Sequence, residues 1–242
     1  MAKTDKPAKR NGKKRERGAT TVYQALREEI LTLKREPGSA LDEVSIAGDF
    51  NLSRTPVREA IFMLSGDALV KVLPNRSSIV APLSLHRLND LLDTWLILSR
   101  AVFVDAALRR TPGDIAGLID RVADFEATIG ADNALDTALA LLALQRSYAE
   151  TARNLFLGQY YPDCLDAGRR TLLLHYFPFA TADDLHLQAD LHRSLIATIE
   201  SGDTGACNRI AGDMLAAILK VIRASLEPTI ADAVDLSTAA LD

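Results

Sequence analysis

Every segment from Ser84 to about Glu227 has the apolar spacing of a helix, and this limits the fold more than any other feature. Helices are expected near 84–110, 114–129, 133–152, 154–176, 183–201 and 203–226. Between them lie Pro112-Gly113, Gly130, Asn154, the segment FPFATADD and Gly202-Asp203. The expected N-caps, whose side chains can accept hydrogen bonds from free backbone N–H groups, are Asp114, Asn133, Asn154 and Asp203. Six antiparallel helices predict an all-α bundle over residues 84–228.

The preceding residues, 18–82, follow a different pattern. A helix is expected from Thr20 to the break at Pro37-Gly38, a short helix over LDEVSIAGDF, and a third from Ser53 to about Ser65. The period then changes, because LVKVL and SIVAP are two short β-rich runs on either side of Pro74-Asn75-Arg76-Ser77. Three helices and a hairpin predict a second, small domain. The protein is thus expected to be mainly α.

Charge differs between the two parts. Through Pro82 there are 15 Lys and Arg against 10 Asp and Glu, and the remaining chain has 13 against 22. A basic front suggests a polyanionic partner. The first 17 residues hold 8 basic and 2 acidic side chains, so the excess could also come from a solubilising tail. Residues 1–17 are predicted to be disordered, and residues 229–242 form a weakly patterned C-terminal tail.

Several classes of protein do not fit. No uncharged apolar run reaches the length of a membrane span, and the basic N-terminus lacks the apolar segment of a secretory signal. The two cysteines, Cys164 and Cys207, make no CxxC motif, which fits a reduced, cytoplasmic setting. The four histidines are scattered, and neither a nucleophile elbow nor a Gly-rich phosphate loop is present. An enzyme is therefore not expected.

The segment NLSRTPVREAIFML carries the most specific signal. Ser53 is the expected N-cap, Pro56 fits the first helical turn, and Arg54 and Arg58 share one side of the helix. Free N–H groups, the hydroxyls of Ser53 and Thr55 and two guanidinium groups suit phosphate oxygens, and arginine also pairs with guanine O6 and N7. The pattern predicts a helix-turn-helix followed by a wing. The alternative is that both arginines only solvate a helix face.

Residues 22–82 resemble the winged-helix domain of GntR-family transcription regulators, through YQALREEIL, PGSALDE, NLSRTPVREA, ALVKVLPNR and VAPLS. The helical part, entered through VAPLSLHRLNDL, resembles the effector domain of the FadR-type (FCD) branch. The resemblance implies a homodimer on a short palindromic operator, with DNA contacts from Ser53, Arg54, Thr55, Arg58, Asn75 and Arg76. Two departures concern the wing: Ala68 and Ser77 stand where the family usually has glycine.

Many FCD domains bind a divalent metal through one Asp and three His. Here the corresponding positions are Leu141, Gln145, His192 and Met214, so the resemblance implies no metal cofactor. Trp95 and Ser99 also replace charged residues of many members. The expected effector pocket is metal-free and partly apolar, lined by Trp95, Ser99, Gln145, Arg146, Tyr148 and His192, with Arg169 or Arg170 as further candidates. Alternatives are a pocket packed shut and a metal site rebuilt around His192 and Asp213.

These features together predict a sequence-specific DNA-binding transcription regulator controlled by a small organic effector, expected to be a carboxylic acid. A repressor is one possibility, and the sequence does not distinguish it from an activator. The other possibilities are a DNA-binding regulator without effector control and a metal-dependent sensor. The first helix of the bundle, 84–110, is the candidate dimer interface. Tyr160-Tyr161 and His175-Tyr176 are expected at the surface or in an interface.

Overall fold

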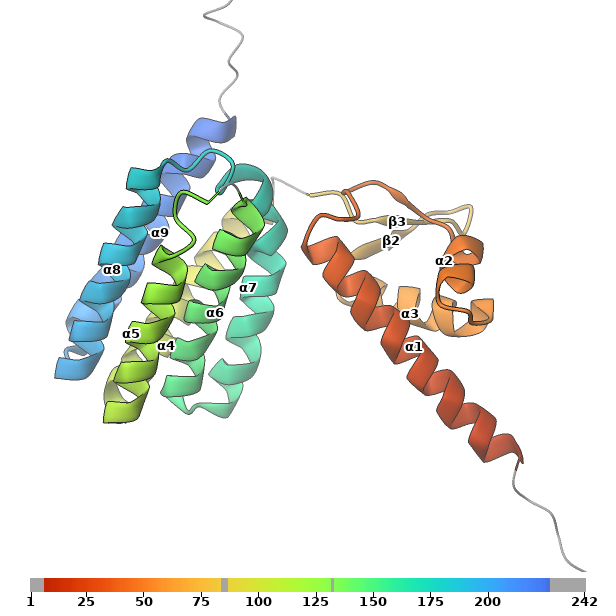
Figure 1. Cartoon of the computed structure of the whole chain (residues 1–242), viewed down its shortest axis with the longest axis horizontal. Coiled ribbons are helices and arrows are strands. Elements are labelled where there is room, and N and C mark those ends of the chain that lie inside the picture. The colour runs from red at the N-terminus through yellow and green to blue at the C-terminus, as the bar shows by residue number, and fades with distance from the viewer. Residues whose placement is uncertain (1–6, 84–86, 132, 227–242) are drawn as a thin grey trace, which may run out of the picture. The chain divides into compact units, whose positions relative to one another are not determined.

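A computed structural model describes residues 7–83, 87–131 and 133–226 of the 242-residue chain. The chain divides into two compact units, residues 1–86 and 87–242, which we call the winged unit and the bundle (Figure 1). The predicted fold class, a winged helix-turn-helix followed by an all-helical bundle, is confirmed.

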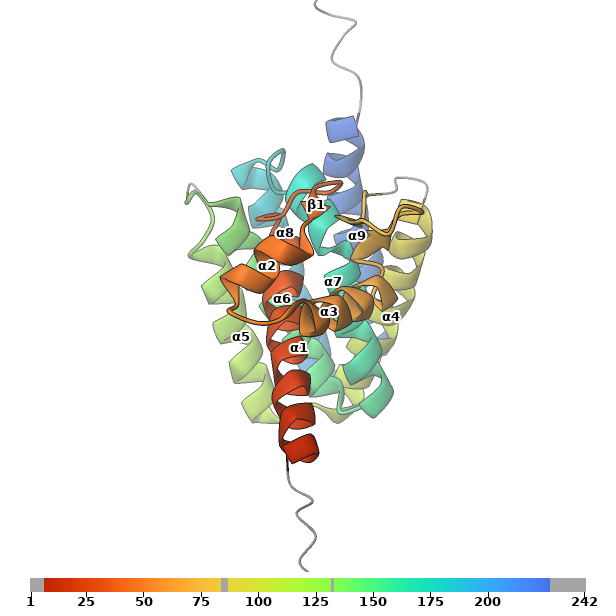
Figure 2. The ribbon, with the colours of Figure 1, turned by 90° about the vertical axis from the view of Figure 1, so that its right-hand side faces the viewer.

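Three helices build the winged unit: α1 (Pro7–Leu31), α2 (Glu43–Asp49) and α3 (Arg54–Gly66). Figure 2 shows α3 lying across α1, and the two helices are packed together. Their contact is apolar because each helix turns one stripe inward, and the fully buried residues of these stripes include Val22, Leu26, Ile30, Val57 and Leu64. Tyr23 adds a polar link, since its hydroxyl donates to Asp67 Oδ2 at 2.6 Å.

The start of α1 differs from the expectation of a disordered segment over residues 1–17. The helix already begins at Pro7, so most of that segment is helical. Alanine, lysine, arginine and glutamate are favourable helix formers, and extending a helix that is already anchored costs little compared with nucleating a new one. Residues 1–6 and the predicted tail 229–242 lie outside the described residues.

A small antiparallel sheet completes the winged unit. Its strands are β1 (Ala40–Leu41), β2 (Val70–Val72) and β3 (Ser78–Val80), in the order β1-β3-β2. The predicted hairpin is β2–β3, in which Lys71 pairs with Ile79. The strand β1 was not expected, because two residues are too few for a visible alternation. Gly38, which has φ of +84°, aligns β1 with β3, because its N–H donates to Val80 O at 2.9 Å.

The bundle contains the predicted helices with ends shifted by only a few residues. They are α4 (Leu88–Arg109), α5 (Pro112–Glu126), α6 (Ala134–Ala152), α7 (Leu155–His175), α8 (Ala182–Ser201) and α9 (Thr204–Leu226). The helix α4 packs against α6, α7, α8 and α9 (Figure 1). Further contacts join α7 to α6 and α9, α8 to α9, and α5 to α6 and α8. Residues projecting from α4, α6 and α9 therefore meet in its interior.

Side-chain caps explain where these helices begin. Asn133 and Asn154 are N-caps as predicted, and Asp203 Oδ1 accepts from Ala206 N at 2.9 Å at the start of α9. Asp114 is a correction: the N-cap of α5 is Thr111, and Asp114 is its reciprocal partner in a capping box. A β-hydroxyl three residues before an acidic residue was the signal for this arrangement.

Two properties of the bundle concern its surroundings. Among the described residues, no helix combines the length and the apolar character that crossing a membrane requires. Both cysteines, Cys164 and Cys207, are buried free thiols, and burial raises the pKa of each to about 11.

Candidate nucleic-acid interface and interhelical pocket

One face of α3 is buried and the other is exposed. Pro56, Val57, Ala60, Ile61 and Leu64 are buried in the core of the winged unit. Arg54, Arg58 and Phe62 follow one another at intervals of four residues on the opposite side, and the Phe62 side chain is 78% exposed. An exposed aromatic ring directly after two exposed arginines is a feature that was not singled out from the sequence.

The N-terminal end of α3 is open. Ser53 occupies the N-cap position, as predicted, but its side chain makes no capping hydrogen bond. Ser53 and Thr55 are exposed. The first N–H groups of α3 therefore point outward without a side-chain cap, which is the arrangement that receives phosphate oxygens at helix ends. The structure thus brings together Ser53, Arg54, Thr55 and Arg58.

Both arginines contact the same carboxylate. Glu43, the first residue of α2, accepts with its Oε2 atom from Arg54 Nη2 at 2.9 Å and from Arg58 Nε at 2.7 Å. The two arginine side chains are 54% and 60% exposed, and that of Glu43 is 20% exposed. Burial alone would raise the pKa of Glu43, but the hydrogen bonds from Arg54 and Arg58 outweigh it and hold that pKa below its usual value.

The tip of the wing carries Asn75 and Arg76. Asn75 Oδ1 accepts from Ser77 N at 3.1 Å and from Ser77 Oγ at 2.8 Å, so the asparagine shapes the turn itself. Arg76 is exposed and has φ of +64°. Ser77 is not among the residues with positive φ, which explains why a hairpin forms although glycine is absent there.

Ala68, the other departure from the family pattern, lies in the left-handed region with φ of +56°. It follows the C-cap of α3, where Ala68 N donates to Ser65 O at 3.2 Å and Leu69 N donates to Leu64 O at 2.9 Å. These two bonds define a Schellman motif, whose left-handed position usually holds glycine. Ala68 therefore keeps the geometry at a conformational cost.

The bundle interior contains a chain of hydrogen-bonded side chains. Tyr161 OH donates to Gln145 Oε1 at 2.6 Å and lies 3.2 Å from Ser99 Oγ. A phenol has one proton, so Ser99 donates to Tyr161. All three residues are buried. Burial raises the pKa of Tyr161, against the lowering effect of hydrogen bonds with Ser99 and Trp95, so the phenol stays neutral.

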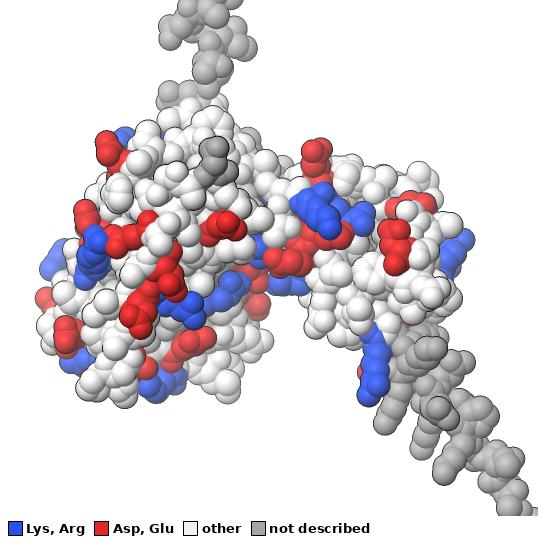
Figure 3. All heavy atoms as spheres, viewed as in Figure 1, with Lys and Arg blue, Asp and Glu red and all other residues white. Residues whose placement is uncertain are grey.

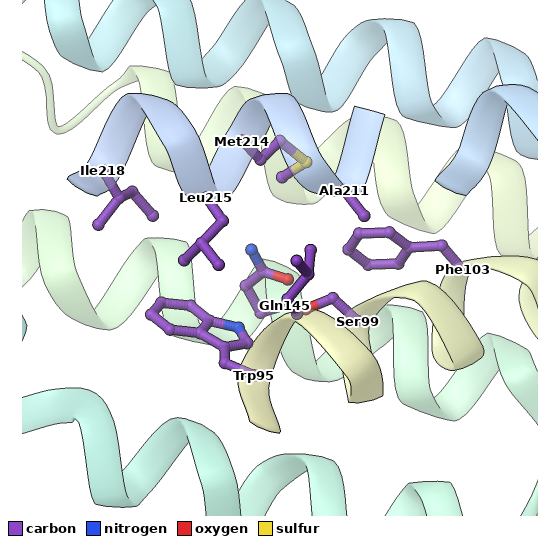
Figure 4. A pocket seen from close by; sticks show the side chains of 9 residues that line it. Trp95, Ser99, Phe103, Gln145, Ala211, Met214, Leu215 and Ile218 are labelled. Carbon is purple, nitrogen blue, oxygen red and sulfur yellow. The ribbon is translucent and has the colours of Figure 1, made fainter. Parts of the chain in front are cut away.

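A small cavity lies beside this chain (Figure 4). Side chains from α4, α6 and α9 point toward one another around it, and its lining consists of Trp95, Leu96, Ser99, Phe103, Gln145, Ala211, Met214, Leu215 and Ile218. Its volume is about 10 Å³, which is room for about one water molecule. The lining is neutral throughout and mostly apolar. The structure therefore brings together three of the predicted effector residues, Trp95, Ser99 and Gln145.

The other three predicted effector residues lie outside the cavity lining. Arg146 is on the neighbouring side of α6 and forms an ion pair with Asp166. Tyr148 and His192 are fully buried and bind each other, with Tyr148 OH 3.0 Å from His192 Nδ1. Burial lowers the pKa of His192 to about 3, so its ring is neutral near pH 7. Its Nε2 atom has no hydrogen-bond partner among the described residues.

Tyr161 is the residue that sequence reasoning missed. It was expected near the surface, but its side chain is fully buried, as is that of Tyr176. The signal was present, because Tyr161, Cys164, Leu165 and Gly168 recur at intervals of three and four along α7 and are buried together. Arg169 and Arg170, further candidates for the pocket, are also buried on α7 but do not line the cavity.

The four positions of the metal site do not fit a divalent cation. Leu141 and Met214 offer no oxygen or nitrogen, and Gln145 is engaged with Tyr161. Asp213 is exposed, whereas His192 is fully buried, so the two do not converge on a rebuilt site. Within the described part of the chain, no three His, Cys, Asp or Glu side chains are grouped as metal ligands.

Charge on the bundle differs from that on α3. In the view of Figure 3, acidic and basic side chains are interspersed over the bundle. Several of them pair there, including Arg193 with Glu126 and Asp190, and Arg121 with Asp124. Residues 83–242 carry 13 Lys and Arg against 22 Asp and Glu. Residues 1–82 carry 15 Lys and Arg against 10 Asp and Glu, so the net charge of the winged unit is positive and that of the bundle is negative.

Comparison with known proteins agrees with this division. The family model described as "Bacterial regulatory proteins, gntR family" matches residues 19–80, and the model described as "FCD domain" matches residues 90–217. Two solved structures share the fold over most of both chains. E. coli McbR/YncC has a TM-score of 0.75 at 16% identity, covering 87% of this chain and 99% of that one. A putative transcriptional regulator GntR from Rhodococcus sp. RHA1 has a TM-score of 0.66 at 20% identity, covering 84% and 97%.

Relatives by sequence match over shorter segments. An uncharacterized HTH-type transcriptional regulator in an unstable DNA locus of Streptomyces ambofaciens is 41% identical over 28% of this chain and 29% of that protein. The transcriptional repressor RspR of Escherichia coli K12 is 35% identical over 28% and 30%. The gluconate operon transcriptional repressor of Bacillus subtilis is 33% identical over 36% and 35%. The aligned segment thus spans about a third of each relative.

The two family models together cover both units, in the order in which the structure places them. The prediction of a regulatory protein rather than an enzyme is thereby confirmed. The chain belongs to the gntR family of bacterial regulatory proteins, in the group that carries an FCD domain after the winged helix-turn-helix.

Proposed function

We propose that this protein regulates transcription by binding double-stranded operator DNA through the winged unit. The observation that supports this most directly is the open N-terminal end of α3, with Arg54 and Arg58 exposed beside it. Helix N–H groups and hydroxyls suit phosphates, a guanidinium fork suits guanine, and the exposed Phe62 ring suits a thymine methyl group. Asn75 and Arg76 at the wing tip add contacts to a backbone or a neighbouring groove.

The test is selection of DNA from a random pool by the purified full-length protein. Enrichment of a short palindrome is expected, because two copies of one recognition helix read two related half-sites. The variant carrying Arg54→Ala and Arg58→Ala should enrich no sequence. Equal enrichment by this variant and the wild type would contradict the assignment of α3 as the recognition helix.

The proposed working form is a homodimer held by the bundle. Ile97 and Leu108 are three helical turns apart on one side of α4, and they are 66% and 64% exposed. Leu155 and Phe156 in the first turn of α7 are 81% and 64% exposed, and Asn154 Nδ2 ties that turn to Asp105 Oδ2 on α4 at 2.8 Å. Exposed apolar side chains grouped in this way mark protein interfaces.

Light scattering at micromolar concentration tests this assembly. Leu108→Glu should shift the protein toward monomer, because an interface cannot bury an unpaired carboxylate at low cost. Ile119→Glu is the matched control, since Ile119 is 55% exposed on α5, a helix that packs on α6 and α8. A wild-type monomer with full operator affinity would exclude the dimer.

We further propose that a small, metal-independent effector enters the cavity between α4, α6 and α9. The neutral lining favours an uncharged molecule with an apolar body and one polar group over the carboxylate expected from the resemblance. Because the cavity has room for about one water molecule, the ligand must displace side chains, and the flexible Met214 is suited to move. Such a ligand shifts operator affinity if it prefers one arrangement of the dimer.

A thermal-shift screen with pairs of neutral amides or alcohols and matched carboxylates tests the ligand class. A true effector raises the midpoint of the wild type and loses this effect in Gln145→Leu. If no compound raises the midpoint, regulation without effector control is the better account. Repression is the proposed direction, since two of the relatives named above are repressors, and a reporter gene behind the selected operator measures it.

A further inference from the structure

Glu43 joins α2 to both arginines of α3. A single oxygen, Oε2, accepts from Arg54 Nη2 at 2.9 Å and from Arg58 Nε at 2.7 Å. Glu43 is also held at its own end, because it is the first residue of α2 and Asp42 caps that helix through bonds to Val44 N and Ser45 N. The capped start of α2 therefore holds the backbone of Glu43, and its carboxylate aligns both guanidinium groups.

The two arginines use different donors for this contact, and this leaves different donors free. Arg58 binds Glu43 through Nε, so this contact does not use its terminal Nη1 and Nη2 groups. Arg54 binds through Nη2 and keeps Nε and Nη1. A fork of two terminal groups is the arrangement that pairs with O6 and N7 of guanine. The geometry thus distinguishes Arg58 as the base reader from Arg54, which keeps donors suited to a phosphate.

The negative charge of Glu43 lowers the affinity of the protein for DNA of any sequence. Affinity for any duplex grows with the number of phosphates that cations neutralise, and a carboxylate among the cations reduces it. At the same time, long arginine side chains lose rotamer freedom when they bind, and prior alignment removes part of that loss for the correct sequence. One residue can therefore lower non-specific affinity while raising specific affinity.

We propose that Glu43 is a positioning residue for sequence discrimination: it holds Arg58 in the orientation that reads guanine and weakens attraction to DNA of other sequences. This inference rests on the proposed binding of operator DNA. It assigns Glu43 no contact with DNA, so its effect must pass through Arg58. The residue is a device for selectivity, not for affinity alone.

The test compares the duplex that the wild type selects most strongly from a random pool with a scrambled duplex of equal length. Glu43→Ala should bind the selected duplex roughly tenfold more weakly, and the scrambled duplex equally or more strongly. Glu43→Gln keeps a neutral acceptor and should fall between wild type and Glu43→Ala. Asp49→Ala removes an exposed acidic side chain from the other end of α2 and should leave the ratio of the two affinities unchanged.

A guanine analogue tests whether the effect passes through Arg58. Replacing each guanine of the selected duplex by 7-deazaguanine removes N7, and at one position the wild type should lose roughly tenfold in affinity. Neither Glu43→Ala nor Arg58→Ala should respond to that replacement. The midpoint of thermal unfolding, measured for each variant, separates this from a loss of folded winged unit.

The outcomes are distinct. If Glu43→Ala binds both duplexes more tightly, Glu43 masks the arginines and the inference is wrong. If it binds both with the wild-type ratio, Glu43 is only structural and the inference is also wrong. If the wild type prefers no duplex at all, the proposed function fails together with the inference drawn from it. Should Glu43→Ala not fold, the ratio measured for Glu43→Gln decides.

Discussion

Polar side chains in the two units lie in opposite surroundings. At the start of α3, Arg54 and Arg58 are more than half exposed and share one carboxylate with solvent around them. In the bundle, Ser99, Gln145 and Tyr161 form a buried chain of hydrogen bonds. Exposed charges act over distance and are weakened by salt, whereas buried hydrogen bonds act only at contact and cost much when broken. Substitutions at the start of α3 should therefore weaken DNA binding and leave the stability of the fold nearly unchanged. Substitutions in the buried chain of the bundle should lower stability first.

The largest effect is expected from removing both exposed arginines. Each arginine that pairs with a base or phosphate contributes about 1–3 kcal/mol to operator binding, so Arg54→Ala with Arg58→Ala should weaken it by about thirtyfold or more. Stability should change by only about 0.5 kcal/mol, because exposed ion pairs contribute little. Fluorescence anisotropy and urea unfolding measure the two quantities. A drop in stability as large as the drop in binding would break the contrast between the units.

Tyr161→Phe should show the reverse. It removes the one hydroxyl that links Ser99 to Gln145 and leaves two buried polar groups without that partner. The expected loss in the free energy of unfolding is about 1–3 kcal/mol. Tyr160→Phe is the control, since Tyr160 is 52% exposed and its hydroxyl can bond to water. Equal stability of the two variants would show that the buried chain is not a structural element.

The dependence of stability on pH tests the surroundings of His192 in the bundle. Burial lowers its pKa in the folded protein to about 3, below the ordinary value of 6.5, so the unfolded state takes up the proton first. The contribution of His192 to stability is complete above pH 6.5 and is lost as the pH falls toward 3, at about 1.4 kcal/mol per pH unit. His192→Gln should have a shallower dependence of unfolding free energy on pH between 6 and 4. Identical curves would mean that His192 is solvated.

The smallest effect is expected in the winged unit, from Ala68→Gly. Alanine pays roughly 1 kcal/mol for the left-handed conformation with φ of +56°, and glycine does not. The variant should therefore be more stable by up to about 1 kcal/mol in urea unfolding. Ser77→Gly should bring no such gain, because Ser77 lacks a positive φ and its hydroxyl donates to Asn75. A gain from Ser77→Gly instead would place the strain in the wing.

Much of the fold followed from the sequence because it is written in local patterns. Apolar spacing of three and four residues located each helix of the bundle, and Asn133 and Asn154 marked two of their starts. The strand β1 was missed because it contains only two residues and depends on pairing with β3, which is distant in sequence. Thr111 was missed as a cap because Asp114 competes for the same role.

The two sites differed in how far residue types could predict them. Arg54 and Arg58 could be placed on one helix face from their spacing alone. Their shared partner Glu43 could not be predicted in this way, because it lies on α2. The spacing of residues does not specify the geometry of the turn that joins α2 to α3. In the bundle, the resemblance to FCD domains suggested six pocket residues, but the packing of α4, α6 and α9 decides which of them line the cavity. Tyr161 binds Ser99 and Gln145 because it lies on the buried side of α7.

The backbone of Leu69 connects α3 to the wing. Its N–H closes the end of α3 by donating to Leu64 O at 2.9 Å, and its C=O accepts from Ala81 N at 2.9 Å at the base of the wing. One peptide segment thus joins the recognition helix to the hairpin with no hinge between them. We expect these two bonds to keep the distance between α3 and the wing tip nearly constant, so that a duplex whose grooves are spaced differently must bend or twist to bind both. Base pairs that no side chain touches would then influence affinity through their stiffness.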